Sequence, residues 1–142
     1  MSASGEIELA PFGAELAAIA MGGAIGACLR LAVSLVIGTT HLHSALAAGI
    51  ANIMGSFLLG LIVGHLESGK AHPLLRPFLT VGVFGSFTTF SALALDNRGI
   101  AVEAGEVLAA AHLAGSIVLG LVAFAVGDWV AERGLGRGRG DE

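Results

Sequence analysis

The chain has 142 residues, of which 55% are hydrophobic and 13% are charged, and its formal net charge is −4. Soluble domains carry about 25% charged residues, so this composition indicates a membrane protein. The few basic residues are scattered along the chain, which argues against a nucleic-acid partner. The N-terminal segment is acidic and lacks the basic region of a signal peptide, so we expect the first apolar segment to be retained as a helix.

Four apolar segments have about the length needed to cross a bilayer, which is ~20 helical residues. They run approximately over residues 16–37, 44–64, 78–95 and 107–126. Short polar loops separate them, and residues 128–142 form a polar C-terminal tail. The sequence therefore predicts one all-α, four-helix transmembrane domain over residues 1–142.

Arg30 is the only charged residue within these expected spans, about two turns from the end of the first. It either snorkels to the membrane interface or attracts anions toward a vestibule. None of the spans contains Asp, Glu or Lys, which argues against a carboxylate proton relay in the middle of the membrane. The five histidines form no convincing ligand cluster, and His41 and His43 fall in an expected loop. The chain also has no Walker loop, nucleophile elbow or CxxC motif, so we do not expect an enzyme.

Pairs of small residues four apart occur in three of the four spans. In lipid, small residues let helix backbones approach closely and so drive helix association. Such pairs are used either between helices of one chain or between two copies of the chain. The pairs are Gly22 with Gly26, Gly60 with Gly64, and Ala111 with Gly115.

Polar side chains also lie inside the spans, where each costs free energy and needs a partner. Asn52 and Ser56 share one face of the second span, and Ser116 lies in the middle of the fourth. The third span carries five hydroxyl residues: Thr80, Ser86, Thr88, Thr89 and Ser91. Such groups either bond within their own helix bundle or line a polar path.

The third span is predicted to be broken in its middle. Gly82 and Gly85 stand next to the hydroxyl cluster, and glycine disfavours helix and permits positive φ. Irregular backbone at this depth persists only where protein or water satisfies it, and freed carbonyl oxygens suit a hard cation. Phe84, Phe87 and Phe90 recur every three residues; they either pack or offer their electropositive ring edges to an anion.

Three of these stretches resemble one known family. "GGAIGACLR" in the first span, "NIMGSFLLG" in the second and "GVFGSFTTFS" in the third are similar to the CrcB, or Fluc, fluoride channels. The resemblance covers nearly the whole chain and implies a fluoride-specific channel of the cell (inner) membrane that passively exports fluoride and lowers its toxicity. It also implies an antiparallel, dual-topology dimer with a structural sodium ion at its interface.

The resemblance assigns roles to individual residues. It implies that the backbone carbonyls of Gly85 and Thr88 from both subunits hold sodium, and that Arg30 is the vestibule arginine. Asn52 would be the pore amide donor, Phe90 the first ring of an aromatic box, and Ser116 the hydroxyl of the fourth helix. The residues expected to line the pore are Asn52, Thr89, Phe90, Ser91, Leu93 and Ser116.

Two features depart from the family pattern. Leu93 stands where the family has its second box phenylalanine, and Ala92 replaces a threonine. A leucine has no positive ring edge, so either conduction is slower or a related subunit supplies the ring in a heterodimer. With the N-terminus inside, the cytoplasmic side would hold five basic residues against Arg98 outside, which favours one orientation. The five are Lys70, Arg76, Arg133, Arg137 and Arg139.

Two other functions remain as alternatives. A small multidrug-type, proton-coupled transporter has a similar size and dimeric habit but needs a carboxylate in its first helix. A non-conducting membrane scaffold would tolerate the loss of the polar residues in the spans.

Overall fold

The computed structural model describes residues 11–37, 41–66 and 72–134, and of residues 41–44 it describes the backbone alone. Within these ranges the chain is helical and contains no strand. The elements are α1 (Phe12–Ile37), α2 (His41–Leu66), α3 (Leu75–Pro77), η1 (Phe78–Phe84), α4 (Gly85–Phe87), α5 (Phe90–Ala104) and α6 (Glu106–Gly134). Elements α3 to α5 form one interrupted span, so four helices are long and apolar enough to cross a membrane, as predicted.

The helices are longer than the expected spans. α1 begins at Phe12 and includes Glu15, and α2 begins at His41, so His41 and His43 are helical rather than in a loop. α6 continues to Gly134, which makes residues 128–134 helical, while 135–142 lie outside the described residues. Because the helices are longer than the expected spans, they include carboxylates that lie beyond those spans, such as Asp96 in α5 and Asp128 in α6.

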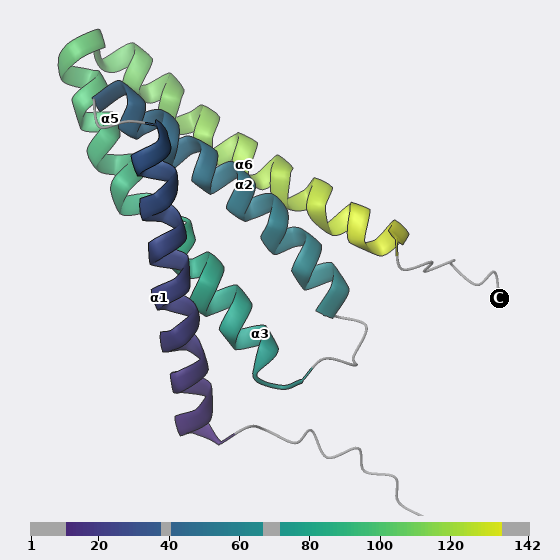
Figure 1. The fold of residues 1–142 in the computed structure, drawn as a ribbon. Helices are drawn as coiled ribbons and strands as arrows, with labels where there is room; N and C mark the ends of the chain where they lie inside the picture. Colours follow the sequence, from purple (N-terminus) through teal and green to yellow (C-terminus); the bar gives the residue numbers. More distant parts are fainter. Residues whose placement is uncertain (1–10, 38–40, 67–71, 135–142) are drawn as a thin grey trace, which may run out of the picture.

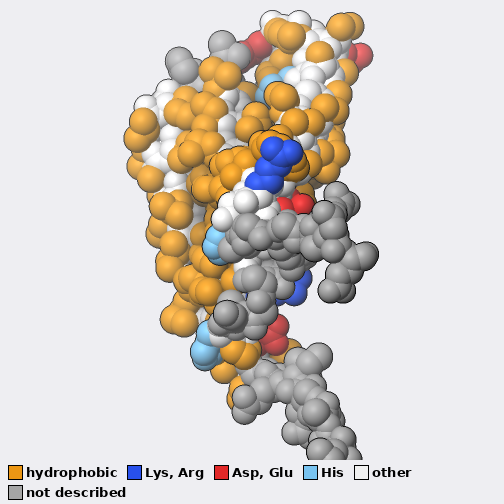
Figure 2. Space-filling view, turned by 90° about the vertical axis from the view of Figure 1, so that its right-hand side faces the viewer, with side chains coloured by type: hydrophobic (Ala, Val, Ile, Leu, Met, Phe, Trp, Pro, Cys, Tyr) orange, Lys and Arg blue, Asp and Glu red, His pale blue; other side chains and the backbone are white. Residues whose placement is uncertain are grey.

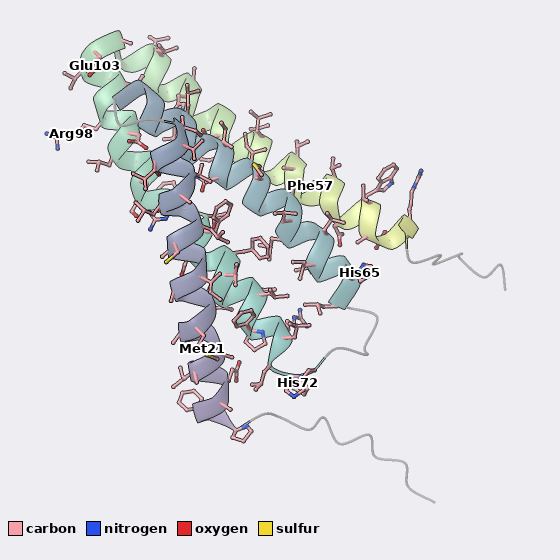
Figure 3. The ribbon with its side chains drawn as sticks, in the orientation of Figure 1. Met21, Phe57, His65, His72, Arg98 and Glu103 are labelled. Carbon is pink, nitrogen blue, oxygen red and sulfur yellow. The ribbon has the colours of Figure 1, made fainter. Side chains whose placement is uncertain are left out.

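The surface of the helices is largely apolar. Figure 2 shows hydrophobic side chains over most of the visible face of the described helices, with charged side chains only in small groups. Figure 3 places His65 and His72 toward one end of the bundle and Arg98 and Glu103 toward the other. Soluble monomers rarely expose apolar surface on this scale, whereas a bilayer solvates it. The distribution supports a multi-pass membrane protein.

The interrupted third span changes neighbours along its length (Figure 1). Before the interruption, η1 packs mainly against α1, and beyond it α5 packs against α2 and α6. α2 and α6 lie side by side over much of their length and make the most extensive contact among the described helices. The interruption in the third span therefore lies between the contact of η1 with α1 and the contacts of α5 with α2 and α6.

Glycines allow both of these pairings. A methyl group added at Gly22 or Gly26 of α1 would overlap a backbone carbonyl of η1, that of Phe78 or Val83. Between α2 and α6, a methyl group at Gly60 would overlap the carbonyl of Phe124. The first two small-residue pairs are therefore used within the chain. Gly115 of the third pair has no atom within 4 Å of an added methyl group.

The buried core is small and rich in alanine. Ala51 of α2 packs with Phe84 and Phe87, which come just before the interruption. Nearer the start of α2, Ala45 packs with Ile100 of α5 and Ala109 of α6. Small side chains on α2 let the aromatic rings and helix backbones approach it, so α2 serves as the support for the broken segment.

Candidate functional site

The third span leaves helical geometry at two threonines. Thr88 has φ −80° and ψ 147°, and Thr89 has φ −152° and ψ 120°, so both are extended. The preceding segment η1 is a π-helix, a wider turn that is rare and often found at functional sites. The helix resumes at Phe90, where the Thr89 side chain caps α5 by accepting the Ala92 amide proton at 3.2 Å.

Glycine flexibility does not cause this break, contrary to the sequence-based expectation. Gly85 has helical angles, φ −63° and ψ −27°, and within the described residues Gly105 alone has positive φ. Gly82 instead provides room, because a methyl group there would lie 2.9 Å from the Gly22 Cα atom. The break lies three residues beyond Gly85 and is stabilised by side-chain hydrogen bonds to its backbone.

Asn52 of α2 makes two of these hydrogen bonds to a single residue. Its Oδ1 atom accepts the Thr89 amide proton at 2.8 Å, and its Nδ2 group donates to the Thr89 carbonyl at 3.3 Å. Gly55, one turn further along α2, allows the close approach, since a methyl group there would lie 2.5 Å from the Thr88 Cγ2 atom. The carboxamide thus replaces the helical partners that Thr89 lacks.

The Gly85 and Thr88 carbonyls are among the groups that lose their usual helical partners at the break. In a continuous helix the Gly85 carbonyl would accept from the Thr89 amide, which here donates to Asn52. The Thr88 carbonyl would accept from the Ala92 amide, which here donates to the Thr89 hydroxyl. The family resemblance assigned these two carbonyls to sodium, and the loss of their helical donors is compatible with oxygen ligation of a hard cation.

A cavity of about 500 Å³ lies against the break, between α2, α5 and α6. Asn52 and Ser56 line it from α2, and Ser116, Gly120 and Phe124 line it at four-residue intervals along α6. From the broken span come Gly85, Thr88, Thr89, Phe90 and Leu93, and the lining is completed by Ile117 and Leu121. None of these described lining residues is ionisable, so the lining offers a few amide and hydroxyl groups among apolar side chains and carries no charge.

The cavity presents hydrogen-bond donors to whatever it contains. Asn52 has a second Nδ2 proton beyond the one that it gives to Thr89. The Thr89 and Ser91 hydroxyls form a hydrogen bond with each other at 3.0 Å. Whichever hydroxyl is the donor, the proton of the other hydroxyl is not used in this bond. By contrast, the Thr88 hydroxyl donates to the Phe84 carbonyl at 2.8 Å, and the Thr80 hydroxyl donates to the Arg76 carbonyl. Such donors suit a small anion.

The aromatic stripe expected at Phe84, Phe87 and Phe90 is divided by the break. Phe84 and Phe87 are buried in the core, whereas Phe90 is 67% exposed and lines the cavity. Leu93 lies on the cavity wall with 3% of its surface exposed.

Two residues expected at the site lie outside the cavity lining. Ser91 touches the site only through its bond to Thr89, and Arg30 is half-buried in α1. The Nε atom of Arg30 is buried and has no hydrogen-bond partner among the described residues. Phe124 was missed by the sequence reasoning, although its spacing of eight from Ser116 on one helix could have revealed it.

Comparison with known proteins identifies the family. The model of the family described as "CrcB-like protein, Camphor Resistance (CrcB)" matches residues 17–128, which is most of the chain. The chain belongs to the CrcB family.

Curated relatives in the family agree in length as well as in sequence. A protein of Nocardia farcinica named "Fluoride-specific ion channel FluC 2" is 39% identical over 128 residues, which cover 89% of this chain and 91% of that one. "Fluoride-specific ion channel FluC" of Hyphomonas neptunium is 42% identical over 120 residues, covering 81% and 93%. The protein of the same name from Paracoccus denitrificans is 40% identical over 119 residues, covering 82% and 93%.

Proposed function

We propose that this CrcB protein is a fluoride-specific channel that lets fluoride leave the cell passively. The observation that carries the proposal is the cavity of about 500 Å³ at the helix break, lined by amide and hydroxyl donors and by no ionisable residue. Fluoride is the smallest halide and the strongest hydrogen-bond acceptor among them. Donors held by a rigid backbone replace its hydration shell, and the Phe90 ring edge adds a weakly positive surface. The names of the relatives support the same ion.

We further propose that the channel is an antiparallel dimer. Support comes from Phe90, a cavity residue whose ring is 67% exposed in the single chain. A second copy, or a related subunit in a heterodimer, would cover this side and close the pore. The basic residues concentrated on one side favour a fixed orientation, and hence a heterodimer, whereas a homodimer requires dual topology.

We also propose that sodium is a structural ion of this dimer, held by the carbonyls of Gly85 and Thr88. Both carbonyls have lost their helical donors, and an unsatisfied carbonyl in hydrocarbon costs several kcal/mol. Carbonyl oxygen is a suitable ligand for a hard cation. Bound there, sodium supplies positive charge that stabilises the break and the contact between subunits, and it is not transported.

Fluoride efflux from liposomes tests the function. Proteoliposomes loaded with potassium fluoride are expected to release fluoride to an external fluoride electrode when valinomycin balances the charge. Vesicles loaded with potassium chloride should release chloride only at the rate of protein-free vesicles. Ser116→Ala removes one donor from the cavity and is expected to slow fluoride efflux several-fold, whereas Gly115→Ala, which meets no atom within 4 Å, should leave it unchanged. Fluoride release no faster than from protein-free vesicles would overturn the proposal.

A further inference from the structure

We propose that Asn52 is a positioning residue for the cation site, because it takes up the Thr89 amide proton and so releases the Gly85 carbonyl for the ion. The inference rests on the proposed sodium site and adds a residue that supplies no ligand atom. It connects the carboxamide in the pore wall to the ion between the subunits.

The first step of the argument is competition for one donor. The Thr89 amide can bond either the Gly85 carbonyl, as in a continuous helix, or the Oδ1 atom of Asn52. The structure has the second arrangement, with Oδ1 at 2.8 Å from the Thr89 nitrogen. Whichever acceptor takes this proton decides whether the Gly85 carbonyl is free. Asn52 therefore controls a ligand atom that it does not touch.

The second step is that Asn52 satisfies both polar groups of the Thr89 backbone. Its Nδ2 group donates to the Thr89 carbonyl at 3.3 Å while Oδ1 accepts the amide proton. Without the carboxamide, both groups would face an apolar environment, where unpaired backbone is strongly disfavoured. In a chain without the carboxamide, the Thr89 amide would therefore donate to the Gly85 carbonyl, and that carbonyl would no longer be available to the cation.

The third step is that α2 holds the carboxamide rigidly. Ala51, next to Asn52, is 1% exposed and packs against Phe84 and Phe87 on the near side of the break. Gly55 lies against Thr88, so α2 contacts the broken segment through the residues on both sides of Asn52. The remaining Nδ2 proton of Asn52 can still serve the cavity, so one side chain couples the ion site to the pore.

Asn52→Leu tests the inference, because leucine has nearly the same size but no hydrogen-bonding group. The purified full chain is titrated with sodium against N-methyl-D-glucamine, and the unfolding midpoint and the dimer–monomer ratio are followed, since a ligand that binds the folded state stabilises it by mass action. We expect Asn52→Leu to weaken apparent sodium affinity about tenfold, which corresponds to ~1.4 kcal/mol. Asn97→Leu is the matched control: it makes the same change at a half-buried amide whose buried Oδ1 atom has no hydrogen-bond partner among the described residues. It should keep the sodium response of the unmodified protein.

Hydrogen exchange supplies a second readout that needs no variant. The Thr89 amide should be protected in the unmodified protein although it lies in extended backbone. If Asn52→Leu does not fold, Asn52→Gln, which displaces the carboxamide by one methylene, takes its place with a smaller expected loss. An unprotected Thr89 amide, or a sodium response in the Asn52 variant equal to that of the unmodified protein, would overturn the inference.

The inference and the channel proposal can fail separately. Fluoride efflux with no sodium response in the unmodified protein would overturn the role of Asn52 at a cation site and leave the channel standing. A sodium response that depends on Asn52, in a protein that does not conduct fluoride, would support the inference and refute the channel.

Discussion

Substitution of Gly127 by alanine tests whether the close contact between α2 and α6 sets the geometry of the site. The added methyl group would overlap the Phe57 carbonyl oxygen and lie 2.9 Å from the Leu61 nitrogen, both of them backbone atoms of α2. Neither atom can move without the helix, so the two helices must separate. Because both helices line the cavity, its donors on α2 and α6 would move apart as well.

Gly115→Ala on the same helix is the matched control, because an added methyl group there meets no atom within 4 Å. Both substitutions gain helix propensity of up to ~1 kcal/mol, which cancels in the comparison. What remains is the overpacking cost at Gly127, about 1–3 kcal/mol. We therefore expect the free energy of unfolding of Gly127→Ala to be lower than that of Gly115→Ala by ~1–3 kcal/mol.

The assay is denaturant unfolding of both variants in the same detergent, together with fluoride efflux from liposomes. Gly127→Ala should be less stable and should release fluoride more slowly, whereas Gly115→Ala should match the unmodified protein in efflux. Equal stability and equal efflux of the two variants would refute the packing argument, because it would mean that α2 and α6 do not approach as closely as the structure places them.

Four further predictions concern the site and the dimer. Phe90→Leu should lower fluoride efflux at least several-fold with little change in single-chain stability, because the Phe90 ring is 67% exposed and lines the cavity. Phe87→Leu, which alters a buried ring, should instead lower the free energy of unfolding by ~1–2 kcal/mol. Thermal unfolding and fluoride efflux, measured on both variants, check these two predictions. Replacing sodium by N-methyl-D-glucamine should shorten the lifetime of the dimer in subunit-exchange measurements; an unchanged lifetime would remove the sodium site. Tags on both termini, probed from each side of the membrane, should show a single orientation if a related subunit completes the dimer, and both orientations if the dimer is homomeric.

The four membrane helices could be predicted because hydrophobic length alone specifies them. Stretches of about 20 apolar residues have few other stable forms in a bilayer, and the described residues contain four such helices. Their ends were harder to predict. α1 and α6 extend past the apolar segments through Glu15 and Glu132, since interfacial residues tolerate charge and remain helical.

The position of the break could be predicted only approximately. Composition pointed to the right region, where glycines and hydroxyl residues are concentrated, but it assigned the cause to glycine. The break depends on Asn52, which is 37 residues away in sequence and bonds both backbone groups of Thr89. A hydrogen bond between helices leaves no local periodicity, so spacing arguments do not reveal it. The separation of Phe90 from Phe84 and Phe87 follows from the same break.

The most direct test of fluoride-specific conduction is the reversal potential of the channel current in a planar bilayer with fluoride on one side and chloride on the other. An uncharged cavity of fixed donors, selective for the smallest halide, predicts a current that reverses near the limit for a fluoride-only conductor, far from zero. A reversal potential near zero, or one that follows the chloride gradient, would contradict the assignment of this protein as a fluoride-specific channel.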